Sequence, residues 1–563
     1  MPTIEVNLKD LEDLLNFKLP ETREELNKIL SYVKGEIEEI KGYEVSIEIK
    51  DSNHPDLWCV EGIARALKGF LGLEKGFKVY NVNFSNEVLI NVEPEVKHVR
   101  PYIAAALIKN VKLTSEVIKG LMHLQDKLDQ TYGRKRRKTS IGLYNFDLIS
   151  PPINYKLAEP EKTSFIPLGF NEKMSLKEIL IKHPKGLEYG HIISGFKHWP
   201  LLVDSKDKIL SMPPIINSND LGKVTEDTKN ILIEVTGTSF KAVSDVLTIM
   251  TTSLADRGGK IHSVKIIYPY EDLNEVITPN LTSKNFSLHL SFINNVLGLN
   301  LSLNDVIELL SKARYNVKKF EDEEISVEVP CYRIDIMHPI DIVEDIAIAY
   351  GYNNIPPRWP LIFTKGGLTT ETMFYDLLRE LMIGFGLQEI LTFSMSNKEK
   401  LFTKMNLKPS FVIEVSNPKM STFTCLRNWL LPGLLEFLSN NKHAEYPQKI
   451  FELGECVEVN EENKIEEFMK LACSLAHSKA SFSEIKSILV SLLSNLNLTL
   501  QLKECLHESF IEGRVGKIVI NDVEVGLIGE IHPKVLEEWG LEVPVAAFEL
   551  NATKLLNLKL PSF

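Results

Sequence analysis

Residues 329–357 read VPCYRIDIMHPIDIVEDIAIAYGYNNIPP, and this stretch organises our interpretation of the whole chain. Pro339 suits the first turn of a helix, because the N–H group that proline lacks would have no partner there. Gly351 is typical of a position just after a helix end. The pattern therefore predicts a helix that begins at Pro339 and ends at Ala349 or Tyr350.

Three acidic side chains of this predicted helix share one face. Asp341, Glu344 and Asp345 are spaced i, i+3 and i+4. Asp335, on the preceding loop, can fold back toward them. Four carboxylates without a His or Cys form a ligand set that suits a hard cation such as Mg²⁺. The alternative is that these acids complement the helix dipole, which explains Asp341 better than Asp345. Spacing alone leaves both interpretations open.

Composition indicates a multidomain cytosolic protein. The 563 residues are too many for one hydrophobic core, so we expect three to five domains. Hydrophobic residues make up 44% and charged residues 25%, as in soluble globular proteins. No apolar run reaches the roughly 20 residues of a membrane helix, and no secretory signal is apparent. Six cysteines without a CxxC pair favour reduced thiols. We therefore expect a cytoplasmic location and no membrane contact.

The charge pattern limits how nucleic acid can bind. A formal net charge of −12 argues against an indiscriminate nucleic-acid binder. Five consecutive basic residues from Arg134 to Lys138 are the best local candidate for contact with phosphate. The alternative for this run is a solvated loop tip.

We expect a multidomain α+β fold with four regions, at 1–85, 86–272, 273–357 and 358–563. The first alternates helix and strand as a small α/β domain. The second is a long mixed region, and the third contains the acidic stretch, preceded by a helix for which Asn304 is the predicted N-cap. In the last region strands dominate, which fits an antiparallel sheet with helices on one side.

These stretches resemble the beta subunit of phenylalanyl-tRNA synthetase, of the archaeal and eukaryotic type. The similarity lies in the acidic stretch and in three further segments. These are DSNHPDLWCVEGIAR at 51–65, LLVDSKDKILSMPPIINS at 201–218 and ILIEVTGTSF at 231–240. The resemblance covers nearly the whole chain, and all four regions occur in family order. It implies that 86–272 is an editing domain, 273–357 a magnesium-binding domain and 358–563 a class II synthetase-like domain.

The family's editing domain hydrolyses tyrosine mistakenly attached to tRNA(Phe). A hydrophobic pocket for phenylalanine rejects an added hydroxyl by only about a hundredfold, so a second hydrolytic site is needed. Glu234 would accept the tyrosine hydroxyl. Backbone N–H and hydroxyl groups of Thr236, Gly237 and Thr238 would contact the ester. The opposite wall of the site would be formed by Ser211, Pro213, Pro214 and Asn217.

A simpler interpretation of the same turn stays open. It is a strand–turn–helix junction in which Thr238 or Ser239 caps the helix. No Ser-His-Asp or Cys-His order is apparent, so the expected nucleophile is water rather than a protein side chain.

The resemblance also implies the cofactor and the partners. Asp335, Asp341, Glu344 and Asp345 would hold Mg²⁺ at the contact with an alpha subunit. The implied assembly is a cytoplasmic alpha2beta2 tetramer that charges tRNA(Phe), with ATP and phenylalanine bound by alpha.

The last region lacks the motifs of an adenylating enzyme. Arg427 stands where the family's second class motif begins, but Asn428 and Trp429 follow it without the expected acid. The chain also lacks a Gly-rich segment closing on Glu-Arg after AAFELN at 546–551. We therefore expect a catalytically silent domain. Two other functions compete with this interpretation, a free-standing hydrolase of misacylated tRNA and a structural scaffold without chemistry.

Overall fold

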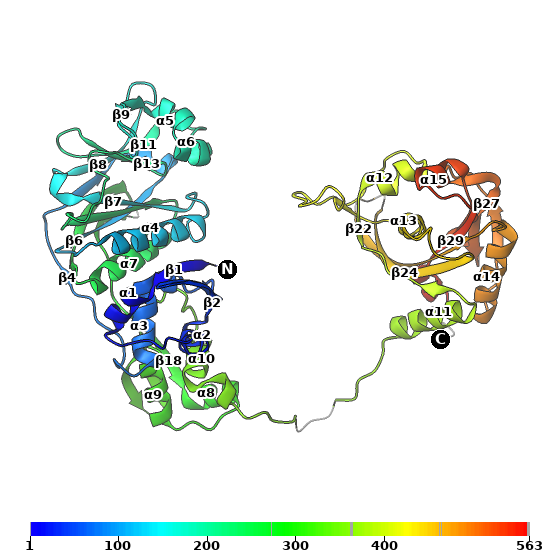
Figure 1. Ribbon diagram of the computed structural model, residues 1–563, viewed down its shortest axis with the longest axis horizontal. Helices are drawn as coiled ribbons and strands as arrows, with labels where there is room; N and C mark the ends of the chain where they lie inside the picture. Colours follow the sequence, from blue (N-terminus) through cyan, green and yellow to red (C-terminus); the bar gives the residue numbers. More distant parts are fainter. Residues whose placement is uncertain are drawn as a thin grey trace. The chain divides into compact units, whose positions relative to one another are not determined.

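The computed structural model describes residues 2–271, 273–321, 323–360, 364–460, 462 and 464–559. The chain forms two compact units, Met1–Trp359 and Pro360–Phe563 (Figure 1). Within the described residues, no helix combines the length and the apolar character needed to span a membrane.

The first unit begins with a three-stranded antiparallel sheet of order β1-β3-β2. Its elements are β1 (Thr3–Asn7), α1 (Leu8–Leu15), α2 (Arg23–Leu30), β2 (Gly35–Lys41), β3 (Glu44–Ile49) and α3 (Val60–Phe70). Along β3, Val45, Ile47 and Ile49 are buried, as the period of two of a strand requires. They pack in one core with Leu11 of α1 and Ile63 of α3.

Two larger sheets follow, a five-stranded sheet of order β4-β15-β6-β14-β7 and a seven-stranded sheet of order β13-β12-β11-β8-β5-β16-β17. Their strands are β4 (Val82–Asn83), β5 (Leu89–Val92), β6 (Tyr102–Lys109), β7 (Thr139–Asn145), β8 (Ile153–Ala158), β11 (Trp199–Val203), β12 (Ile209–Met212), β13 (Ile216–Asn217), β14 (Ile231–Gly237), β15 (Lys260–His262), β16 (Val264–Tyr270) and β17 (Leu273–Thr278). The neighbouring elements are α4 (Ser115–Gln130), β9 (Ser164–Phe165), β10 (Met174–Ser175), α5 (Leu176–Lys182), α6 (Pro184–Tyr189) and α7 (Phe240–Asp256).

Strand β14 is buried on both faces, which explains its apolar run. Ile231, Ile233 and Val235 pack in one core with α4 and α7, which lie side by side against the five-stranded sheet (Figure 1). Leu232 packs in the other core, between the two sheets. Glu234 follows Leu232 at the period of a strand and therefore lies on the same face, which makes it a charged exception in a buried strand.

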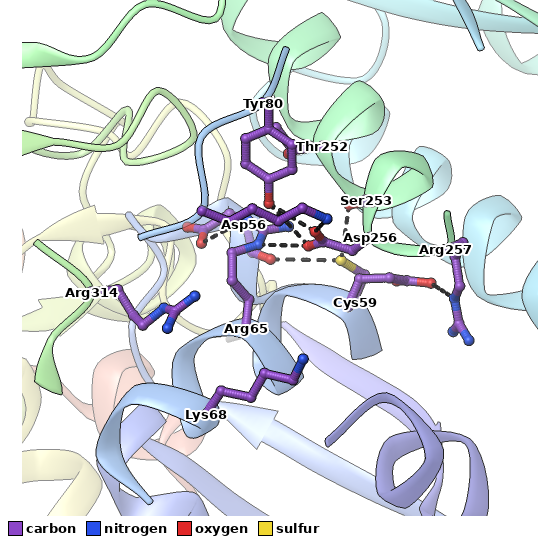
Figure 2. A network of polar contacts seen from close by, with 12 residues as sticks. Asp56, Cys59, Arg65, Lys68, Tyr80, Thr252, Ser253, Asp256, Arg257 and Arg314 are labelled. Carbon is purple, nitrogen blue, oxygen red and sulfur yellow. Dashed lines mark hydrogen bonds and ion pairs between the residues drawn. The ribbon is translucent and has the colours of Figure 1, made fainter. Parts of the chain in front are cut away.

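Polar contacts join the N-terminal sheet region to the end of α7 (Figure 2). Nε of Arg65, on α3, donates to Oδ2 of Asp256 at 2.8 Å, and Tyr80 donates to Oδ1 of the same carboxylate at 2.9 Å. Arg257, directly after α7, donates to Glu61 of α3 at 2.6 Å. Because Arg65 and Glu61 are buried, these contacts fix α3 to α7 as part of one unit.

The third part of the first unit has a sheet of order β18-β20-β19 and three helices. Its elements are β18 (Lys284–His289), α8 (Leu290–Leu297), α9 (Leu303–Lys312), β19 (Asn316–Glu321), β20 (Glu324–Val329) and α10 (Pro339–Tyr350). The predicted acidic helix is confirmed, because α10 begins at Pro339, ends at Tyr350 and is followed by Gly351 with φ 92°. The predicted cap of α9 was wrong. Ser302 caps this helix, and the side chains of Ser302 and Asp305 bond reciprocally to each other's backbone N–H.

The second unit is built on a seven-stranded sheet of order β21-β24-β25-β29-β28-β27-β26. Its strands are β21 (Gln388–Glu389), β22 (Met395–Ser396), β23 (Cys425–Leu426), β24 (Gln448–Val459), β25 (Ile465–Ala476), β26 (Gln501–Glu504), β27 (Phe510–Ile520), β28 (Val523–Ile531) and β29 (Val545–Asn551). Its helices are α11 (Thr370–Gly384), α12 (Lys398–Leu401), α13 (Leu431–Asn440), α14 (Phe482–Asn495), α15 (Pro533–Glu538) and α16 (Ala552–Lys559).

Helices cover both faces of this sheet, which corrects the expectation of one covered face. Helices α11, α14 and α16 pack with one set of strand side chains, including Phe451 and Phe548. Helices α13 and α15 pack with the alternate set, including Ile450 and Ala547. Every residue of β29 is buried, so neither face of this strand is left to solvent.

Candidate functional site

A cavity of about 290 Å³ lies beside β7, the edge strand of the five-stranded sheet. Its walls come from α4, β7 and the segment that runs from β12 through β13. Ser211 and Asn217, predicted as the facing wall, line this cavity together with Glu234. The two prolines of the wall, Pro213 and Pro214, also line it. The structure thus brings the predicted acid and the predicted wall to one place.

Glu234 is the buried carboxylate of this cavity, with only 3% of its surface exposed. Its Oε2 accepts a hydrogen bond from the Tyr144 hydroxyl at 2.8 Å, and that hydroxyl lies 2.8 Å from Oγ of Ser211. Its Oε1 is buried without a hydrogen-bond partner in the described residues. Burial raises the pKa of Glu234 to about 7, because the ionised form loses its hydration. In the ionised form of Glu234, Oε1 is the oxygen without a hydrogen-bond partner among the described residues, so it is the one that could accept a hydrogen bond from a ligand.

The close approach of Tyr144 and Glu234 depends on a glycine. Gly142 of β7 is the cross-strand partner of Glu234 on β14. A Cβ atom at this position would overlap both the Tyr144 hydroxyl and Oε2 of Glu234. A glycine inside a buried strand thus marks a close approach of side chains, which the strand pattern alone did not reveal.

Thr236 belongs to a buried network beside the cavity rather than to its lining. Nε of Arg100 donates to Oγ1 of Thr236 at 3.0 Å, and Nη2 of Arg100 donates to the Thr236 carbonyl at 2.7 Å. The same Nη2 donates to Oγ of Ser140 at 3.1 Å. Thr236 is not among the residues that line the cavity, but its hydroxyl lies near enough to Glu234 to favour the ionised form of that carboxyl and so lower its pKa. Arg100 is 136 positions away in sequence, and no local signal identifies it.

Thr238 lies past the end of β14, with its side chain exposed. Its backbone N–H donates to the Lys138 carbonyl at 3.0 Å. Ser239 caps α7 by accepting from the backbone N–H of Ala242. The junction is therefore a capped helix start as well as the end of the strand that carries Glu234, and Thr238 lies outside the cavity lining.

Each of the four acids of the predicted metal site already has a partner in the chain, and two of them share one arginine. Asp335 accepts from Nη2 of Arg333 at 2.7 Å, and Asp345 lies 2.7 Å from the same nitrogen and also accepts from the Tyr315 hydroxyl. The remaining two acids are Glu344, which is paired with Lys34 at 2.7 Å, and Asp341, which accepts from the backbone N–H groups of Met337 and His338.

This arrangement does not fit one magnesium ion bound by all four carboxylates. Among the described residues, the group close enough to share an ion contains Asp335 with His54 and Asp56 instead. Nε2 of His54 lies 3.5 Å from Asp56 and 3.8 Å from Asp335. Asp335 and Asp345 share the buried guanidinium of Arg333, which already balances part of their charge.

Arg427 of the second unit is enclosed by partners of its own chain. Its Nη1 lies 2.6 Å from Oε1 of Glu452 and 2.8 Å from Oγ1 of Thr392, and its Nε donates to the Glu455 carbonyl. Glu452 is fully buried, and Arg427 is nearly so. These contacts tie Nη1 and Nε of the guanidinium to the fold, and Arg427 also lines a cavity of about 280 Å³.

Comparisons with known proteins agree over the length of the chain. Residues 355–552 match the family described as the phenylalanyl tRNA synthetase beta chain CLM domain. Residues 286–352 match the tRNA synthetase B5 domain.

Relatives match along nearly their whole length. The phenylalanine–tRNA ligase beta subunit of Pyrococcus abyssi is 45% identical over 559 residues, which cover 98% of this chain and 99% of the relative. The beta subunit of Archaeoglobus fulgidus is 40% identical over 560 residues, covering 99% of each. The crystal structure of an N-terminal fragment of the phenylalanyl-tRNA synthetase beta-subunit from Pyrococcus horikoshii has a TM-score of 0.60 and 43% identity. It covers 62% of this chain and 100% of that chain.

Proposed function

This chain belongs to the family of phenylalanine–tRNA ligase beta subunits, and from that premise we propose that its cavity hydrolyses tyrosine from mischarged tRNA(Phe). It is a ligase subunit. We propose that it acts in the cytoplasm within an alpha2beta2 tetramer whose alpha subunits bind ATP and phenylalanine and charge tRNA(Phe).

The observation that carries the hydrolysis is the unpartnered Oε1 of Glu234 in the cavity. A tyrosyl group would satisfy this acceptor with its phenolic hydroxyl, whereas a phenylalanyl group would leave it buried and unpaired. Sites built in this way reject the analogue that lacks the hydroxyl by roughly 10⁴- to 10⁵-fold. The cavity would therefore remove tyrosine and spare phenylalanine.

Water is the nucleophile in this proposal. None of the described residues that line the cavity is a His or Cys, so this lining offers neither a cysteine nucleophile nor the histidine base that commonly activates a serine. Ser211 is engaged with the Tyr144 hydroxyl, which positions Glu234. The chain's contribution is to hold the aminoacyl group by its side chain while water attacks the ester carbonyl, releasing tyrosine and tRNA.

We propose the second unit as an assembly module with a class II synthetase-like sheet and no adenylation chemistry. Arg427 supports this, because its charge is already balanced by the buried Glu452 of the same unit. Magnesium binding by Asp335, Asp341, Glu344 and Asp345 stays a prediction. An ion would have to displace Arg333 and Lys34 from three of these carboxylates.

The proposed hydrolysis is tested with the complex made by co-expressing this chain with a phenylalanine–tRNA ligase alpha subunit. Tyr-tRNA(Phe) should be cleared by the parental complex and at least tenfold more slowly with Glu234→Ala, since the acceptor for the hydroxyl is lost. Charging of tRNA(Phe) with phenylalanine should stay near the parental rate. If the variant complex clears Tyr-tRNA(Phe) at the parental rate, Glu234 has no role in the hydrolysis. Failure to co-purify with alpha would contradict the assembly.

A further inference from the structure

A basic turn, Arg134–Lys138, adopts an unusual backbone beside the cavity. Arg134, Lys135 and Arg136 have φ angles of 51°, 53° and 64°. This left-handed region is unfavourable for residues with a Cβ atom, and such residues normally occur there singly. The turn persists only because the surrounding structure holds it, which is typical of segments with a binding role.

Arg136 fixes the turn from inside. Its side chain is buried, with Nε 2.9 Å from Oδ2 of Asp129. Its Nη1 donates to the carbonyl groups of Pro214 at 3.2 Å and Ile215 at 2.9 Å. Because Pro214 lies in the facing wall of the cavity, Arg136 holds the basic turn and this wall at a fixed separation.

Arg100 holds the same turn through its backbone. Its Nη1 donates to the carbonyl of Arg136 at 3.1 Å, while its Nε and Nη2 bind Thr236 on the strand of Glu234. The buried Arg100 thus connects the basic turn to the strand that carries the cavity carboxylate.

Three of the other four cations of the turn face solvent, whereas Lys138 is half-buried and lies over the ring of Tyr132. Arg134, Lys135 and Arg137 are exposed, and no carboxylate of the described residues pairs with them. Lys223, which lines the cavity, is also exposed and unpaired among those residues. Lys223 lines the cavity, and Arg134, Lys135 and Arg137 flank Arg136, which also lines it, in a chain whose net charge is −12.

We propose that the basic turn, together with Lys223, binds the phosphates of an RNA 3′ strand and so positions its terminal ester at the cavity. The inference rests on the proposed hydrolysis, because it assigns how that site receives its substrate. Arginine and lysine bind the sugar–phosphate backbone independently of sequence. Arg136, which lies inside, is a positioning residue.

The structure favours RNA over an acidic peptide as the partner. The backbone that carries these cations is held by Arg100 and Arg136 before binding, and guanidinium groups match phosphate oxygens in two-point hydrogen bonds. They also lie beside a cavity whose proposed ligand is attached to an RNA. Displacement of bound tRNA by poly-glutamate at equal charge concentration would contradict this assignment.

The test uses the full chain carrying Arg134→Asn, Lys135→Asn and Arg137→Gln. Asparagine tolerates the left-handed backbone, so the change removes charge and keeps the turn. A matched control carries Lys112→Gln, Lys173→Gln and Lys197→Gln, which are exposed and do not line the cavity.

Binding of tRNA(Phe) is measured over a range of salt concentrations. For single-stranded nucleic acid, the slope of log affinity against log salt becomes shallower by about 0.7 for each phosphate contact that is lost. The slope of the basic-turn variant should therefore fall by about 2, and the control should keep the parental slope. Equal slopes in the variant and the parent would overturn the proposal, as would an equal fall in the control.

Rates of hydrolysis of two substrates, one with RNA and one without, distinguish a failure of this inference from a failure of the proposed function. The variant should clear Tyr-tRNA(Phe) roughly tenfold or more slowly at low salt, yet hydrolyse tyrosine ethyl ester at the parental rate. If the parental protein clears neither substrate, the proposed hydrolysis fails, and the salt slopes still decide whether the basic turn binds RNA.

Discussion

The hydroxyl group of Tyr144 donates a hydrogen bond to Oε2 of Glu234 at 2.8 Å, across neighbouring strands of one sheet. The other oxygen of Glu234 stays buried without a partner in the described residues. Tyr144 therefore orients the carboxylate and leaves one acceptor for a ligand. The proposed selectivity for tyrosine depends on this asymmetry.

Glu234 should make stability depend on pH. Its pKa rises from 4.5 to about 7 on folding because of burial, so ionisation opposes the folded state. The contribution is most favourable below pH 4.5 and is lost as pH rises through about 7, by about 3 kcal/mol in all. Chemical denaturation of the parent and of Glu234→Gln across this range should give free energies of unfolding that diverge. Parallel curves would contradict the raised pKa.

Gly142→Ala should disturb the cavity from a position that does not itself line it. The new Cβ would collide with the Tyr144 hydroxyl and with Glu234, so we expect a loss of about 1–3 kcal/mol and slower clearance of Tyr-tRNA(Phe). The matched control is Gly120→Ala, on α4, where the added Cβ has no described atom within 4 Å apart from its chain neighbours and the backbone of its own helix. This control should gain stability, as helical glycines do when replaced by alanine. Equal thermal stability of the two variants would contradict the close approach at Gly142.

The isolated chain should show no phenylalanine-dependent exchange between ATP and pyrophosphate. Arg427 is held by Glu452 and Thr392, so its charge is already balanced within the second unit. The complex with alpha should show exchange under the same conditions, which controls for the assay. Robust exchange between ATP and pyrophosphate by a preparation free of alpha would refute the proposal that the second unit is catalytically silent.

Magnesium should support assembly if the acidic face of α10 binds it. Glu344→Gln together with Asp345→Asn should then lower the tetramer fraction in sedimentation of mixed subunits, and EDTA should do the same to the parent. Glu308→Gln, an exposed acid on the neighbouring helix α9, is the control. If neither the double substitution nor EDTA changes the tetramer fraction, these acids serve only as partners of Arg333 and Lys34.

Local sequence rules were sufficient for some elements. Pro339 and Gly351 set the ends of α10, because backbone chemistry at helix termini is local. The cap of α9 shows the limit of the same rules. Ser302 was preferred over Asn304 because Asp305 completes a reciprocal pair with it.

Contacts between distant strands were not predictable in the same way. Arg100 occupies the Thr236 hydroxyl, and Tyr144 orients Glu234, but both contacts depend on the order of strands in the sheet. The prediction that helices cover only one face of the second unit's sheet was wrong for the same reason. The burial of β29 on both faces depends on where the helices pack, which local sequence does not specify. The basic run resembled a loop tip until the structure showed that Arg136 is buried within it.

The most direct measurement is the ratio of hydrolysis rates for Tyr-tRNA(Phe) and Phe-tRNA(Phe), determined as kcat/KM for the parental complex and for Glu234→Gln. The unpartnered acceptor of Glu234 predicts a parental ratio of roughly 10³ or more in favour of tyrosine, falling by at least tenfold in the variant. Phenylalanine charging, measured in parallel, should be unchanged. A ratio that is the same in both proteins would show that Glu234 does not recognise the tyrosine hydroxyl.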